Sequence, residues 1–190
     1  MRVLGIDPGT AIVGFSIVDF EKNKINVIDY GCIFTDKDMA MEDRLCIIFT
    51  ELDKLIKKYN PDEMAVEELF YFKNNKTVIS VGQARGVIVL CGRLNKLNVY
   101  SYTPLQVKMG ITGYGRAEKK QIQLMVQKIL NLEEIPKPDD AADALAVAVT
   151  HINTARSGVF QRELAGTISK KSLKKTKLTA QEYRDLILNR

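Results

Sequence analysis

The spacing of apolar residues changes near residue 39, and this change limits the chain to a mixed architecture. Before that point apolar and polar residues alternate, which predicts extended strands over residues 2–6, 12–20 and 24–34. After it, apolar residues recur every three or four positions over residues 39–59, which predicts a helix that ends before Pro61. Because both patterns are present, we expect a sheet with helices packed against it.

The rest of the chain alternates short strands with helices. The further elements that we expect are strands over 63–69 and 98–103, and helices over 76–97, 103–109, 116–130 and 138–156. Helical segments flank the strand that contains Glu67, so we expect this strand to be central and covered on both faces. The predicted fold is one α/β domain with a mixed five-stranded sheet over residues 1–157. A basic tail over residues 158–190 follows it, which we interpret as flexible, either as a solvated extension or as a second contact to phosphate.

The composition excludes several classes of protein. Hydrophobic residues make up 46% of the chain and charged residues 27%, which excludes wholesale disorder. No apolar run approaches the roughly 18 residues of a membrane span, and Asp7 interrupts the apolar start before a signal peptide could form. Three cysteines without a C-x-x-C pair argue against a disulfide framework, and the lone His151, interpreted as structural, excludes a histidine-rich metal site. We therefore expect a cytoplasmic protein.

Positive charge is concentrated in the middle of the chain. Residues 69–130 carry ten basic side chains and a single acid, Glu118, whereas residues 1–68 carry fourteen acids against eight basic residues. Since an ordinary solvated surface mixes the two signs, we interpret the middle segment as a face that binds a polyanion. The alternative is a helical face whose charges pair with acids elsewhere in the chain.

Four carboxylates occupy positions that packing alone does not explain. Asp7 ends the first predicted strand before a Pro-Gly turn, and Glu67 interrupts an apolar strand, where an unpartnered charge is costly. Asp140 and Asp143 are three residues apart in the last predicted helix, so they share one face. An Asx turn accounts for Asp7 and helix capping for Asp140, but neither accounts for Asp143 in an apolar helix.

Clustered carboxylates repel one another unless a cation joins them. Mg²⁺ is a hard cation that takes oxygen ligands, so it fits this set. Beside a polyanion-binding face, the set predicts two-metal hydrolysis of phosphodiesters. Glu68 is an extra acid beside Glu67, but the alternation of a strand turns it to the other face and favours Glu67 as the ligand.

Six short motifs, in order and at compatible spacing, resemble the RuvC family of bacterial Holliday junction resolvases. They are Gly5-Ile6-Asp7-Pro8-Gly9-Thr10, Ala65-Val66-Glu67-x-x-Phe70, Gly82-Gln83-Ala84-Arg85-Gly86, Gln106-Val107-Lys108, Gly113-x-Gly115-x-Ala117-Glu118-Lys119-x-Gln121 and Asp140-Ala141-Ala142-Asp143-Ala144-Leu145-Ala146. The resemblance covers residues 1–157. It implies an RNase H-like fold and a homodimer that nicks opposing strands of a four-way DNA junction symmetrically, in recombination and repair.

The resemblance also implies the residues of the site. It assigns metal ligation to Asp7, Glu67, Asp140 and Asp143, which would hold a pair of Mg²⁺ ions that Mn²⁺ can replace. Its D-A-A-D register favours Asp140 over the neighbouring Asp139. Lys108 and Lys119 match basic residues that contact the scissile phosphate or stabilise its developing charge.

The DNA contacts and partners follow from the same resemblance. The DNA-binding residues that it implies are Phe70, Lys73, Lys76, Arg85, Lys108, Arg116, Lys119 and Lys120. Phe70 matches an aromatic residue that stacks on unpaired bases at the junction. The RuvA–RuvB branch-migration complex is the implied protein partner. A C2 dimer would present matching sites to a two-fold junction, and the glycine-bearing helix over 76–97 is our candidate dimer interface.

Three other functions compete with this interpretation. The first motif also resembles the phosphate loop of actin-like ATPases, but that fold needs a second lobe for which 190 residues are too few. A junction-binding protein without nuclease activity would use the basic segment alone, but it would have no use for acids that face phosphate. A structure-blind nuclease of the same fold, for example one acting on RNA–DNA hybrids, would differ in its preference between junction and duplex.

Overall fold

Alternating residues at the start of the chain build three antiparallel strands, β1 (Arg2–Asp7), β2 (Ile12–Glu21) and β3 (Lys24–Phe34). We describe a computed structural model, in which residues 1–69, 75–156 and 158 are described. β4 (Glu63–Glu67) and β5 (Asn98–Tyr102) complete one sheet in the order β3-β2-β1-β4-β5. The pairs β1/β4 and β4/β5 are parallel, which confirms the predicted mixed five-stranded sheet with a central β4.

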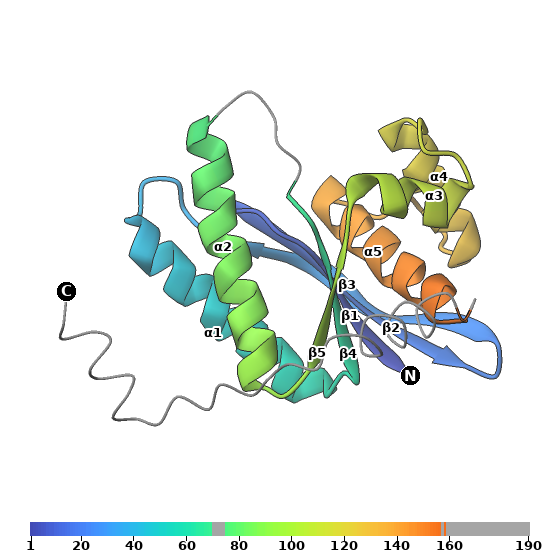
Figure 1. Cartoon of the computed structure of the whole chain (residues 1–190), viewed down its shortest axis with the longest axis horizontal. Helices are drawn as coiled ribbons and strands as arrows, with labels where there is room; N and C mark the ends of the chain where they lie inside the picture. Colours follow the sequence, from blue (N-terminus) through green and yellow to red (C-terminus); the bar gives the residue numbers. More distant parts are fainter. Residues whose placement is uncertain (70–74, 157, 159–190) are drawn as a thin grey trace, which may run out of the picture. The chain divides into compact units, whose positions relative to one another are not determined.

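Helices cover both faces of this sheet (Figure 1). α1 (Met41–Tyr59) and α2 (Asn75–Leu94) pack on one face, where the core includes Leu4, Ile48 and Ile88. α5 (Asp139–Arg156) covers the other face, together with α3 (Pro104–Thr112) and α4 (Lys119–Ile129). The apolar residues of α5 are buried along most of its length, which explains why its pattern has no polar face.

Three predicted helix boundaries differ from the structure by three residues. α2 ends at Leu94 and not at residue 97, because Lys96 adopts the left-handed conformation (φ 64°) and the Leu97 N–H donates back to the Gly92 carbonyl (3.0 Å). α4 begins at Lys119 and not at residue 116, because the Glu118 backbone N–H donates to Gln121 Oε1 (2.9 Å) and caps the helix there. α3 runs on to Thr112, three residues beyond the predicted end, and stops at Gly113 in the left-handed conformation (φ 70°).

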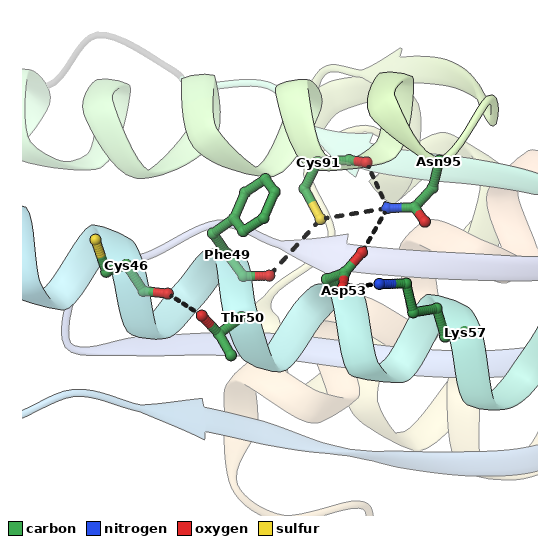
Figure 2. A network of polar contacts seen from close by, with 7 residues as sticks. All are labelled: Cys46, Phe49, Thr50, Asp53, Lys57, Cys91 and Asn95. Atoms are coloured by element: carbon green, nitrogen blue, oxygen red, sulfur yellow. Dashed lines mark hydrogen bonds and ion pairs between the residues drawn. The ribbon is translucent and has the colours of Figure 1, made fainter.

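A polar network joins the two helices of the α1–α2 layer (Figure 2). Asn95 Nδ2 donates to Asp53 Oδ1 (2.9 Å) and to the Cys91 carbonyl (3.0 Å), and Lys57 Nζ donates to Asp53 Oδ2 (2.6 Å). The hydrogen bond from Lys57, followed by that from Asn95, lowers the pKa of Asp53. The network therefore holds the carboxyl end of α2 against α1.

Within the described ranges, no helix is long and apolar enough to cross a membrane. The expectation of a cytoplasmic location, the domain boundary after residue 157 and the interpretation of the tail stay predictions.

Candidate active site

Asp7 and Glu67 lie at the carboxyl ends of neighbouring parallel strands. β1 and β4 pair in register up to Ile6 and Val66, so the next residue of each strand projects at the same edge of the sheet. The charge of Glu67 contributes to the raised pKa of Asp7, so the two carboxyl groups lie close together.

Two glycines allow α5 to bring its carboxylates to this edge. A Cβ added at Gly14 of β2 would lie 2.0 Å from the Asp140 carbonyl oxygen, and one at Gly5 of β1 would lie 2.3 Å from the Ala144 carbonyl oxygen. Ser16 Oγ donates to the same Ala144 carbonyl (2.9 Å). The first turns of α5 therefore rest directly on the backbone of β1 and β2.

The electrostatics show that the carboxylates form one cluster. Burial, followed by the charges of Glu67, Asp143 and Asp140, raises the pKa of Asp7 to about 8. Burial also raises the pKa of Glu67 to about 7, with a contribution from Asp143. Burial is also the main cause that raises the pKa of Asp143. Asp7, Glu67 and Asp143 thus lie in one cluster, and Asp140 lies close enough for its charge to act on Asp7 and Asp143.

Both predicted lysines line a hollow beside these acids. The hollow is about 180 Å³ in volume, and its lining residues are Glu67, Pro104, Val107, Lys108, Lys119, Ile122 and Asp143. Lys119 Nζ lies 3.1 Å from Asp143 Oδ2 and 3.3 Å from Asp139 Oδ2. Burial lowers the pKa of Lys119, but its bonds to these two aspartates outweigh that effect and raise the pKa overall.

The extra acid Asp139 has a different environment from the four clustered acids. Its side chain is exposed, accepts a bond from Gln123 Nε2 (2.9 Å) and pairs with Lys119. The bond from Gln123, followed by that from Lys119, lowers its pKa. Asp139 therefore joins α4 to α5 at the rim, whereas Asp143 faces the hollow.

The cluster fits a hard divalent cation. In the described part of the chain, no three carboxylate, imidazole or thiol groups stand close enough to hold an ion as they are. Positive charge already lies at the cluster, because the Lys119 ammonium pairs with Asp143. A cation that took its place would meet half-buried carboxylate oxygens, which are the ligands that Mg²⁺ prefers.

The other predicted DNA-binding residues are spread more widely. Arg116 and Lys120 are exposed near the start of α4. Arg85 lies on the opposite face of the sheet from the acids, where its Nη2 donates to Ser101 Oγ (2.8 Å). Phe70 and Lys73 lie outside the described residues, and Lys76 is described only as part of the α2 backbone.

His151 belongs to a buried hydrogen-bond network that is separate from the four acids. Its Nε2 lies 2.6 Å from Glu63 Oε2, and its Nδ1 lies 2.7 Å from the Tyr102 hydroxyl. Burial lowers the pKa of His151 against the opposing effect of Glu63, so the ring is neutral at pH 7. A neutral ring satisfies both contacts when Nε2–H donates to Glu63 and Nδ1 accepts from Tyr102. This arrangement fits the structural interpretation of His151.

Sequence reasoning missed Cys32 and the role of Gly14. Burial raises the pKa of Cys32 to about 11, and the charges of Asp140 and Asp7 contribute, so its thiol lies at the edge of the cluster. Gly14 pairs with Cys32 across β2 and β3, beneath the first turn of α5. The signal for Gly14 was a glycine within an apolar strand, which marks a close approach of another backbone.

The comparisons with known proteins agree with this geometry. Residues 3–151 match the family described as "Crossover junction endodeoxyribonuclease RuvC". The chain is 67% identical over 157 residues to a protein of that description from Fusobacterium nucleatum subsp. nucleatum, covering 83% of each chain. The solved Thermus thermophilus RuvC structure is 35% identical, with a TM-score of 0.78 over 83% of this chain and 97% of that one. A second T. thermophilus RuvC structure, in complex with a Holliday junction substrate, is 33% identical, with a TM-score of 0.76 over the same shares.

Proposed function

This chain belongs to the RuvC family of crossover junction endodeoxyribonucleases, and we propose that Asp7, Glu67, Asp140 and Asp143 are the residues with which it resolves four-way DNA junctions. The family uses divalent metal. We propose that Mg²⁺, which Mn²⁺ can replace, binds as a pair of ions among these four carboxylates. The observation that carries the proposal is the set of buried, mutually repelling carboxyl groups whose pKa values are raised.

The chain's own residues prepare the site for a phosphodiester. Bound divalent ions would supply an activated water and neutralise the leaving 3′ oxygen. Lys108 and Lys119 approach the same hollow from α3 and α4, so a phosphate there would meet an ammonium group on each of two helices. We propose that Lys119 leaves Asp143 for the scissile phosphate when the carboxylates receive their cation.

The remaining DNA contacts extend the proposal beyond the hollow. Arg116 and Lys120 flank the start of α4, where they would bind phosphates on either side of the cleaved bond. Arg85 would contact a DNA strand that passes over the face of the sheet covered by α2. We propose phosphate contacts for Lys73 and Lys76 and base stacking for Phe70.

A homodimer would use the outer face of α2. That face exposes Ile79 (65% exposed), Leu90 (53%) and Leu94 (63%), and a Cβ added at Gly86 would meet nothing within 4 Å. An exposed apolar helix face of this kind suits a self-complementary interface. A charged residue in place of Val89 should convert the dimer to monomers in size-exclusion chromatography with light scattering. A variant that stays dimeric would contradict this assignment. Cooperation with a RuvA–RuvB complex is proposed on family membership alone.

Cleavage of synthetic substrates tests the proposed function. With Mg²⁺, the wild type should place paired nicks on opposing strands of a four-way junction and leave a linear duplex and an RNA–DNA hybrid intact. Asp7→Asn should abolish nicking and retain junction binding. Asp19→Asn is the matched control, because Asp19 pairs with Arg2 on another edge of the molecule and should leave nicking unchanged. Cleavage by Asp7→Asn, or equal cleavage of duplex and junction, would refute the proposal.

A further inference from the structure

The loop between α3 and α4 presents an apolar surface that the catalytic cluster does not use. Five exposed side chains form this α3–α4 surface: Leu105 (57% exposed), Met109 (50%), Tyr114 (58%), Leu124 (38%) and Met125 (36%). Tyr114, Leu124 and Met125 line a shallow hollow of about 380 Å³. In Figure 1 the two helices lie side by side, apart from the α1–α2 layer. Exposed apolar side chains gathered in this way mark a binding surface.

The backbone holds Tyr114 in an outward position. Thr112 Oγ1 accepts from the Tyr114 backbone N–H (3.1 Å) and lies 3.0 Å from the Tyr114 carbonyl oxygen. Gly113 adopts φ 70° and ends α3. A Cβ at Gly115 would lie 2.6 Å from Leu105 Cδ1, so the loop packs tightly on α3. The ring is therefore presented from an ordered turn, at a low entropic cost of binding.

The segment of the chain that forms this surface is mostly basic. Residues 104–130 contain five basic side chains and a single acid, Glu118. Lys128 lines the same hollow as Tyr114, and Arg116 follows the loop. Exposed aromatic and aliphatic groups among cations fit a nucleic acid strand, because the cations bind phosphates while the rings pack on bases or sugars.

The surface continues directly from the proposed cleavage site. Lys108 lies four residues before the end of α3, and Lys119 is the first residue of α4. Both lysines line the hollow beside the acids, so the Tyr114 loop spans the two elements that would hold the scissile phosphate. At about 5.4 Å per helical turn, Tyr114 lies within a few nucleotides of that phosphate.

We propose that the α3–α4 surface binds the junction strand next to the cleaved bond, with the Tyr114 ring packed against a base or sugar. This inference rests on the proposed function, since it takes the acids and lysines as the point of cleavage. It adds a contact to the nucleoside itself, whereas the basic residues contact only phosphates. Tyr114 therefore contributes to the choice of the cleaved position as well as to affinity.

Fluorescence of a modified junction tests this contact. 2-Aminopurine is placed at successive positions on either side of the cleaved bond, and the proteins carry Asp7→Asn so that the substrate stays intact. The added variants are Tyr114→Ala and Tyr114→Phe, with Ile28→Ala as the control for loss of an exposed apolar side chain (45% exposed) on β3. A ring packed on the probe quenches its emission.

We expect quenching at one or two neighbouring positions, lost in Tyr114→Ala and kept in Tyr114→Phe and Ile28→Ala. Junction Kd should weaken about tenfold in Tyr114→Ala, within the range for base–aromatic stacking. Identical quenching and Kd in Tyr114→Ala would overturn the proposal. Loss of the dimer with unchanged quenching would also overturn it, by making the surface a protein interface. A wild type that fails to cleave while Tyr114-dependent quenching persists would instead refute the proposed function alone.

Discussion

Raising the pH from 7 to 8 in the absence of metal should destabilise this protein, because the folded site holds protons that the unfolded chain has lost. The pKa of Asp7 is about 8 and that of Glu67 about 7 in the fold, against about 4 for both groups when unfolded. Across this interval the pair retains about one proton, so the free energy of unfolding should fall by about 1 kcal/mol per pH unit. The sign follows from the raised pKa values, since the native state binds more protons.

Urea denaturation in EDTA at pH 7.0, 7.5 and 8.0 measures this slope. Asp7→Asn removes the titrating group and a charge next to Glu67, so its slope should be less than half that of the wild type. Asp19→Asn should keep the wild-type slope, because the hydrogen bond from Arg2 lowers the pKa of Asp19 and keeps it ionised across the interval. Saturating Mg²⁺ should stabilise the wild type more at pH 8 than at pH 7. A flat or rising stability in the wild type would refute the burial and mutual repulsion of the acids.

Three further predictions follow from the packing of the site. Gly14→Ala should reduce junction cleavage at least tenfold, because its Cβ would collide with the first turn of α5. Ile28→Ala changes an exposed side chain of β3 and should retain full cleavage. His151→Phe should lower the free energy of unfolding by about 2–3 kcal/mol in urea titrations, because it leaves a carboxylate and a hydroxyl without their partner. Lys119→Ala should lower the single-turnover rate of junction cleavage by about 10²-fold with little change in Kd, whereas Lys54→Ala on α1 should not; an equal loss in both would contradict the role of Lys119.

The element order was predictable because hydrophobic period is a local property of the sequence. Helical spacing around Leu52 reflects one face turned to the core, and the structure confirms Leu52 as buried. β1 and β2 are buried on both faces, since Val3 lies in one core cluster and Leu4 and Ile17 in the other. The start of α4 was wrong by three residues, because the cap depends on a single side-chain contact from Gln121. Helix capping of this kind changes a boundary without changing the apolar pattern.

The candidate acids were predictable for a different reason. Glu67 and Asp143 each interrupt a run of apolar residues. Burial of a carboxylate there is costly unless it has a partner, so the sequence alone marks both residues as candidates. Their convergence was not predictable from that pattern, since it depends on Gly14 and on the parallel pairing of β1 with β4. The pairing of Lys119 with Asp143 joins two helices through long side chains, which sequence spacing does not encode.

Anomalous diffraction from crystals soaked in Mn²⁺ tests the central claim most directly, namely that these carboxylates form the metal site. Anomalous peaks should lie among Asp7, Glu67, Asp140 and Asp143, with Lys119 Nζ moved away from the Asp143 carboxylate. The same soak of Asp7→Asn crystals should lose the peak nearest residue 7. Peaks elsewhere on the molecule, or a wild-type cluster that keeps its Lys119–Asp143 contact in saturating Mn²⁺, would contradict the account.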